Sequence, residues 1–160
     1  MSAVAGRIVR INVSRGGVPK HPVARARVTA LGLEGDAHRD TERHGGPERA
    51  LCLFALERIE ALRAEGHPMS PGTIGENLTV AGLDWDPVGP GARFRLGADV
   101  LIEVTRYTRP CVNIGGAFRG GRYGRVSQTR HPGWSRVYAR VVAPGEIRAG
   151  DPIVPLTPCR

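Results

Sequence analysis

The stretch ARFRLGADVLIEVTR, residues 92–106, points most clearly to the fold class of this chain. Apolar and polar side chains alternate in both halves of the stretch, as they do in half-buried β-strands. The tripeptide Gly97-Ala98-Asp99 separates the two halves and supplies the turn of a β-hairpin. Further strands are expected in five segments: residues 7–13, 26–31, 72–80, 136–142 and 147–154.

The composition agrees with a mainly β protein. The 160 residues include 22 glycines and 13 prolines, which are scattered along the chain. This density excludes a helical bundle and favours many short elements, roughly six to nine strands, joined by turns. The length suits a single domain over residues 1–160, with a core at about 5–155 and a frayed tail at 156–160.

One main helix is expected at about residues 47–65. Pro47 occupies the favoured first helical position, and Gly66 and Pro68 supply a stop. Apolar side chains recur at helical spacing: Leu51, Ala55, Ile59 and Leu62. Within this helix, Cys52 is expected to be a small buried hydrophobic residue.

The chain is strongly basic, with a formal net charge of +8 and a single lysine, Lys20. Such a charge can attract nucleic acid, anionic lipid or a phosphorylated small ligand. The arginines form no single run, and three phenylalanines, two tryptophans and three tyrosines are too few for a base-stacking platform. Nucleic acid is therefore not the expected partner.

The sequence also bears on the compartment. No apolar run reaches the roughly 18 to 20 residues of a bilayer span, and no signal-peptide pattern opens the chain, so no membrane partner is expected. The three cysteines, Cys52, Cys111 and Cys159, form neither a CxxC pair nor a zinc-finger spacing. These features favour a reducing cytoplasm over a disulfide-forming environment.

Cys111 is the strongest candidate for chemistry. It follows a predicted strand, and Pro110 fixes the backbone before it. Arg106 and Arg109 place positive charge nearby, which favours thiolate, a nucleophile and a soft metal ligand. The alternative is an inert structural cysteine at the end of a strand.

Three other groups could bind a polar or anionic ligand, and each has a structural alternative. Gly45 and Gly46 precede the expected helix, whose free N–H groups attract anions, and His44 could add a hydrogen bond. Lys20 between two prolines could meet a phosphate, or be an ordinary exposed lysine. Glu76 and Asn77 could bind a polar ligand, or only shape a turn.

The order of these pieces resembles a known family. Lys-x-Pro-Val is followed by Gly-Leu-x-Gly-Asp, His-Gly-Gly-Pro-Glu-Arg-Ala-Leu, Gly-Glu-Asn-Leu-Thr, Pro-Cys and Tyr-Ala-Arg-Val-Val-x-x-Gly-x-Ile-x-x-Gly-Asp. Over roughly residues 5–155 the chain is similar to the MOSC domain, named after the C-terminal part of molybdenum-cofactor sulfurase. It resembles the small stand-alone bacterial type.

The resemblance implies a closed β-barrel-like domain with the main helix and short peripheral helices. It implies a molybdopterin-type cofactor in or near a cleft, in a family also associated with pyridoxal phosphate. Cys111 would be the ligand to molybdenum or the carrier of a persulfide. The cofactor-binding residues implied are Lys20 at the phosphate, His44, Gly45, Gly46, Glu76, Asn77 and Arg109.

Two functions follow from the resemblance. The first is a component of a reductase for N-hydroxylated or N-oxide compounds, which needs a separate electron donor because the chain has no ferredoxin-type cluster motif. The second is a carrier that takes sulfur from a cysteine desulfurase. A larger branch of the family has arginine and lysine where this chain has Thr108 and Asn113.

Overall fold

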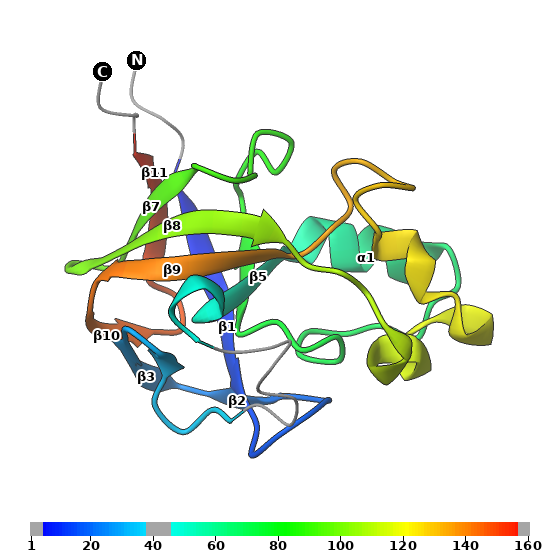
Figure 1. The fold of residues 1–160 in the computed structure, drawn as a ribbon, viewed down its shortest axis with the longest axis horizontal. Helices are drawn as coiled ribbons and strands as arrows, with labels where there is room; N and C mark the ends of the chain where they lie inside the picture. The colour runs from blue at the N-terminus through cyan, green and yellow to red at the C-terminus, as the bar shows by residue number, and fades with distance from the viewer. Residues whose placement is uncertain (1–4, 38–45, 157–160) are drawn as a thin grey trace.

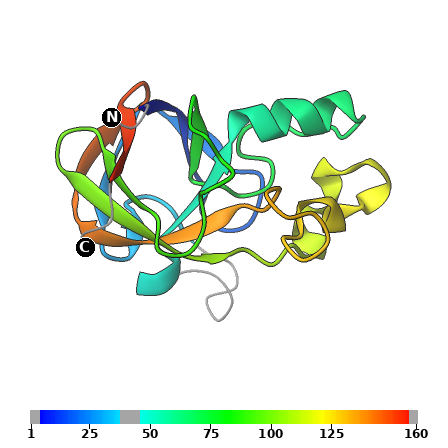
Figure 2. The same cartoon turned by 90° about the horizontal axis from the view of Figure 1, so that it is seen from above.

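The computed structural model describes residues 5–37 and 46–156. Its centre is a closed barrel of seven strands, which Figure 2 shows as a ring viewed from above. In barrel order the strands are β1 (Gly6–Val13), β11 (Pro152–Leu156), β7 (Arg93–Leu96), β8 (Val100–Tyr107), β9 (Val137–Ala143), β5 (Leu51–Ala55) and β6 (Leu78–Ala81). The expected mainly β, closed barrel-like fold is confirmed.

The first and last strands of the barrel close the ring. Gly6 of β1 pairs with Ile153 of β11, and Arg7 pairs with Pro152. The Ile8 N–H donates to the Asp151 carbonyl oxygen at 2.8 Å, beside these pairs. All strand pairs in the ring are antiparallel except β5 with β6, which is parallel.

Short strands surround the ring. β2 (His21–Val23) extends the sheet outward from β1, and a small second sheet has the order β10-β3-β4. The strands of that sheet are β3 (Arg25–Thr29), β4 (Gly32–Leu33) and β10 (Gly145–Arg148). The described residues thus contain eleven strands, more than expected, and five of them have only two to four residues.

The predicted helix at 47–65 is wrong in its first half. The structure has a three-residue 3-10 helix η1 (Pro47–Arg49), then β5, and only then α1 (Leu56–Ala64). All five residues of β5 are buried because neighbouring strands lie on both sides and side chains pack on both faces. An apolar run of this kind fits a buried strand as well as a helix. The predicted stop holds, since α1 ends two residues before Gly66.

The alternating strands were predicted correctly. The hairpin about Gly97 is β7 and β8, and residues 7–13 form all but the first residue of β1. Leu156, which was expected in the frayed tail, instead pairs with Arg93 in β11. The rest of that tail, residues 157–160, lies outside the described residues.

Between β8 and β9 the chain forms three short 3-10 helices. They are η2 (Val112–Ala117), η3 (Arg119–Gly121) and η4 (Tyr123–Val126), the expected short peripheral helices. Figures 1 and 2 show them gathered with α1 on one side of the barrel. Within the described ranges, no helix has the length and apolar character needed to cross a membrane.

Candidate functional site

A cavity of about 200 Å³ lies beside the barrel where several loops meet. Its walls come from the loop after β1, from β5, from the turn before β6 and from the segments that flank β8 and β9. Four residues that the sequence singled out line it together: Lys20, Asn77, Arg109 and Cys111. Other lining residues are Arg49, Cys52, Arg136 and Tyr138.

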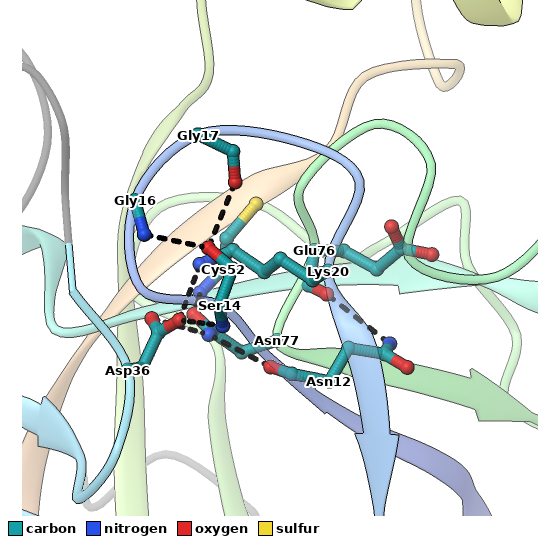
Figure 3. A network of polar contacts seen from close by, with 9 residues as sticks. All are labelled: Asn12, Ser14, Gly16, Gly17, Lys20, Asp36, Cys52, Glu76 and Asn77. Carbon is teal, nitrogen blue, oxygen red and sulfur yellow. Dashed lines mark hydrogen bonds and ion pairs between the residues drawn. The ribbon is translucent and has the colours of Figure 1, made fainter.

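Lys20 lies in the cavity wall as half of a buried ion pair. Its Nζ is 2.6 Å from Asp36 Oδ1, and the two side chains are only 6% and 3% exposed. The Ser14 N–H and the Asn77 side-chain amide also donate to the Asp36 carboxylate, each at 2.9 Å (Figure 3). The lysine charge is therefore balanced within the protein, and the alternative of an ordinary exposed lysine is wrong.

Asn77 connects the segments that line the cavity through its hydrogen bonds. Its backbone N–H donates to the Cys52 carbonyl oxygen at 2.7 Å, and its Oδ1 accepts from the Cys52 N–H at 3.0 Å. Its Nδ2 also donates to the Asn12 carbonyl oxygen at 3.3 Å. The side chain thus ties β5, β1 and the turn before β6 to one another, which fixes the register of the cavity wall.

Two cysteines line the cavity, and their surroundings differ. Cys52 is buried on β5, and this burial raises the pKa of its thiol to about 11, so it stays protonated near neutral pH. Cys111 is half-buried at the start of η2, where its carbonyl oxygen accepts the Ile114 N–H at 3.1 Å. Cys111 is therefore the more accessible thiol for a ligand or a partner.

Arg136 brings a buried positive charge to the cavity. It is 6% exposed, and its guanidinium group donates to the Ile74 carbonyl oxygen at 2.7 Å. Its Nε is buried and has no hydrogen-bond partner among the described residues. A buried donor without a partner is costly, and an anionic ligand in the cavity would satisfy it.

Tyr138 and Arg49 complete this wall. The Arg49 guanidinium group lies 5.9 Å from the centre of the Tyr138 ring. Burial raises the pKa of the Tyr138 hydroxyl to about 12. The phenol therefore acts as a neutral hydrogen-bonding group near neutral pH.

Glu76 does not line the cavity but lies buried beside it. The Thr79 hydroxyl donates to Glu76 Oε2 at 3.1 Å and accepts the Asn12 side-chain amide at 3.1 Å. Burial raises the pKa of the Glu76 carboxyl group. Its hydrogen bonds support the turn that carries Asn77.

The candidate anion site at residues 44–46 is described by the structure only at Gly46. Gly46 is exposed and is not among the residues that line the cavity. It precedes the single 3-10 turn η1 instead of a long helix, so the helix-dipole argument for an anion site there fails. His44 and Gly45 lie outside the described residues.

Sequence reasoning missed Arg49, Arg136 and Tyr138, and it gave Cys52 only a structural role. The strand register brings two of these four residues together, since Cys52 lies opposite Tyr138 in the pairing of β5 with β9. Residues 51–55 were assigned to a helix, so this pairing could not be foreseen. The alternation in residues 136–142 was the available signal, because it marks Arg136 and Tyr138 as sharing one face.

Comparison with known proteins identifies a family and several relatives that this chain resembles. The family model of the MOSC domain matches residues 40–154. The protein YiiM of Escherichia coli is 34% identical over 131 residues, which are 79% of this chain and 57% of YiiM. A Gibberella moniliformis protein named "Reductase" is 34% identical over 130 residues, or 22% of its own length. The chain thus spans little more than half of one of these relatives and about a fifth of the other.

Solved structures agree with these relatives. The crystal structure of YiiM from Geobacillus stearothermophilus matches with a TM-score of 0.73 and 26% identity, over 95% of this chain and 75% of that one. YiiM from Escherichia coli matches with a TM-score of 0.70 and 27% identity, over 96% and 71%. The barrel, the sequence relatives and the family model agree, and the chain belongs to the MOSC domain family.

Proposed function

We propose that this chain binds a molybdenum cofactor in the cavity, with Cys111 as the sulfur ligand of the metal. We propose further that it is a component of a reductase for N-hydroxylated or N-oxide compounds. The observation that carries the proposal is the half-buried Cys111 thiol, which shares a cavity with the buried cation of Arg136. The family and the relative named "Reductase" support it.

The residues of the cavity fit such a group. A thiolate is a soft ligand suited to a heavy metal, and pterin phosphates and oxo-metal centres are anionic. Cys111 would hold the metal, while Arg136, with its unpartnered Nε, and Arg109 would meet anionic oxygens. Lys20 would act mainly through Asp36, by keeping the wall in shape. The bound cofactor would supply redox chemistry at molybdenum.

The surrounding side chains would orient the ligand and limit the access of water. Cys52 and Tyr138 both keep their protons near neutral pH, so they offer fixed hydrogen-bond donors and not bases. Reduction of a substrate also needs electrons, which a separate donor protein would supply. A reducing compartment such as the cytoplasm would keep both thiols available.

Elemental analysis of molybdenum tests this function. The protein would be purified from a host that makes the cofactor, with Cys111→Ser and Cys52→Ala prepared in parallel. We expect near-stoichiometric molybdenum in the wild type and in Cys52→Ala, and its loss in Cys111→Ser. Full retention of the metal in Cys111→Ser would contradict the role of Cys111, and circular dichroism would check that each variant is folded.

Sulfur transfer is the second candidate, and the partial exposure of Cys111 favours it. The Cys111 thiolate would attack the outer sulfur of a desulfurase persulfide, and the desulfurase thiolate would leave with the electron pair of the broken S–S bond. Mass spectrometry after incubation with a desulfurase and cysteine should then show one added sulfur on Cys111. A protein without molybdenum that gains no sulfur would contradict this candidate.

A further inference from the structure

A second hollow of about 1030 Å³ adjoins the cavity, and Arg109 lines both. It lies where the end of α1 faces η3, η4 and the loop that follows, on the side of the barrel where Figure 1 shows these helices. We call it the arginine groove. Its basic residues are Arg109, Arg119, Arg122, Arg125, Arg130, His67 and His131.

The groove carries positive charge that the described residues do not balance. Among the described residues, Glu65 is the one acidic residue that lines the groove, and both of its oxygens accept from Arg125 at 2.8 Å. Arg125 is also fixed by stacking on Trp134, with its guanidinium group 4.2 Å from the ring centre. This leaves Arg109, Arg119, Arg122 and Arg130 without an acidic partner in the described parts of the chain.

The volumes of the two hollows indicate that one ligand could occupy both. Sites that bury a drug-sized ligand usually have about 300 to 1,000 Å³, so the cavity of about 200 Å³ holds only one end of such a molecule. The molecule must continue outward, and the arginine groove begins at the shared residue Arg109. A ligand that spans both would carry its most anionic part in the groove.

We propose that the arginine groove binds the phosphate or diphosphate group of a ligand whose other end enters the cavity. The link to the cavity rests on the proposed function, whereas phosphate binding in the groove does not. Arginine suits this role because its planar donors match phosphate oxygens. The backbone of Gly121, which lines the groove with a φ of 70°, is also uncovered, because a Cβ there would meet nothing within 4 Å.

A small phosphate ligand fits better than a nucleic acid strand. Tyr123 is the one Phe, Tyr or Trp residue that lines the groove in the described ranges, whereas single-strand binding sites stack successive bases on several aromatic side chains. The arginines are also concentrated in one short segment between β8 and β9, instead of following an extended track over the surface.

Calorimetric titration of the metal-free protein with inorganic pyrophosphate at low salt tests the proposal. The double variant Arg122→Gln/Arg130→Gln should weaken binding at least about tenfold, because it removes two charge-assisted contacts. The control Arg95→Gln removes an exposed arginine on β7, outside both hollows, and should leave the affinity unchanged. No saturable binding in the wild type, or equal binding in the double variant, would overturn the proposal. Much tighter, steeply salt-dependent binding of a single-stranded oligonucleotide would also overturn it.

Two further measurements identify the source of the phosphate. Loss of molybdenum in the double variant would show that the phosphate belongs to the cofactor. Retained molybdenum with a raised KM only for phosphorylated N-hydroxylated substrates would assign it to the substrate. A wild-type protein that holds no molybdenum but still binds pyrophosphate would contradict the proposed function and leave the phosphate site of the arginine groove supported.

Discussion

At the scale of single residues, the buried ionisable groups near the cavity differ in how their charge is compensated. Lys20 has Asp36 as a close partner, whereas Glu76 has only hydrogen bonds and one oxygen, Oε1, without a partner among the described residues. Burial accordingly raises the pKa of Glu76, so ionising it opposes folding.

The Glu76→Gln substitution should therefore change how stability depends on pH. The folded protein holds the Glu76 proton more tightly than the unfolded chain does. At a pH below the ordinary value of 4.5, both states are protonated and no penalty exists; as the pH rises above it, the unfolded chain ionises first and the wild type loses stability. The stability of Glu76→Gln relative to wild type should rise over this interval, as measured by urea unfolding at acidic and neutral pH.

Glu103 provides the control for this experiment. Its hydrogen bond to Arg140 lowers the pKa of its carboxyl group, so its contribution to stability is present above the ordinary pKa and is lost in acid. The stability of Glu103→Gln relative to wild type should thus fall as the pH rises. The same trend in both variants would show that burial of Glu76 does not set the effect.

At the scale of elements, β5 contributes Cys52 to the cavity, and the sequence analysis assigned its residues to a helix. Leu53 and Phe54 point to opposite faces of the strand, yet both are fully buried. Phe54 also meets the edge of Trp85 at a ring-centre distance of 6.1 Å. A strand covered on both faces has no polar side to mark its period.

We expect Leu53→Ala and Phe54→Ala each to lower the free energy of unfolding by about 2 to 5 kcal/mol, because each leaves a cavity in a packed core. Val142→Ala, on an exposed position of β9, should change it by less than about 0.5 kcal/mol. Urea unfolding of the three variants measures these differences. A small loss at Leu53 or Phe54 would contradict burial of both faces of β5.

The elements that could be predicted are those with a visible alternation. Residues 92–106 and 7–13 show it, since one of their faces meets the core and the other meets solvent. Of the residues that the resemblance implied for a cofactor site, Lys20, Asn77, Arg109 and Cys111 line one cavity, whereas Glu76 and Gly46 do not. Arg136 and Tyr138 could not be placed because their position depends on which strands are neighbours, and that is a property of the closed ring.

At the scale of the whole molecule, stability depends on the close approach of β1 to β6 at Gly6, the residue that also pairs with β11 where the barrel closes. A side chain at Gly6 would place its Cβ 2.5 Å from the Ala81 carbonyl oxygen and 2.8 Å from Leu83. The first of these neighbours is backbone of β6, which cannot move without disturbing its pairing with β1.

Gly6→Ala should therefore lower the free energy of unfolding by about 1 to 3 kcal/mol. Gly116→Ala is the matched control, because a Cβ there meets nothing within 4 Å, and it should be neutral or slightly stabilising. Thermal unfolding of both variants gives the comparison. Equal melting temperatures for the two would contradict the tight approach of β1 to β6.

The pairing of β1 with β11, which closes the barrel, also has a consequence for biosynthesis. β11 pairs with both β1 and β7, so the ring stays open until residues 152–156 have left the ribosome. Until then β7 has one unpaired edge, and so does the start of β1, the kind of edge that recruits strands from other chains. A message truncated before the codon for Pro152 would yield a barrel that lacks β11, with the edges of β1 and β7 exposed. Such a product would be bound by chaperones or degraded by proteases instead of folding as a shorter version of the protein.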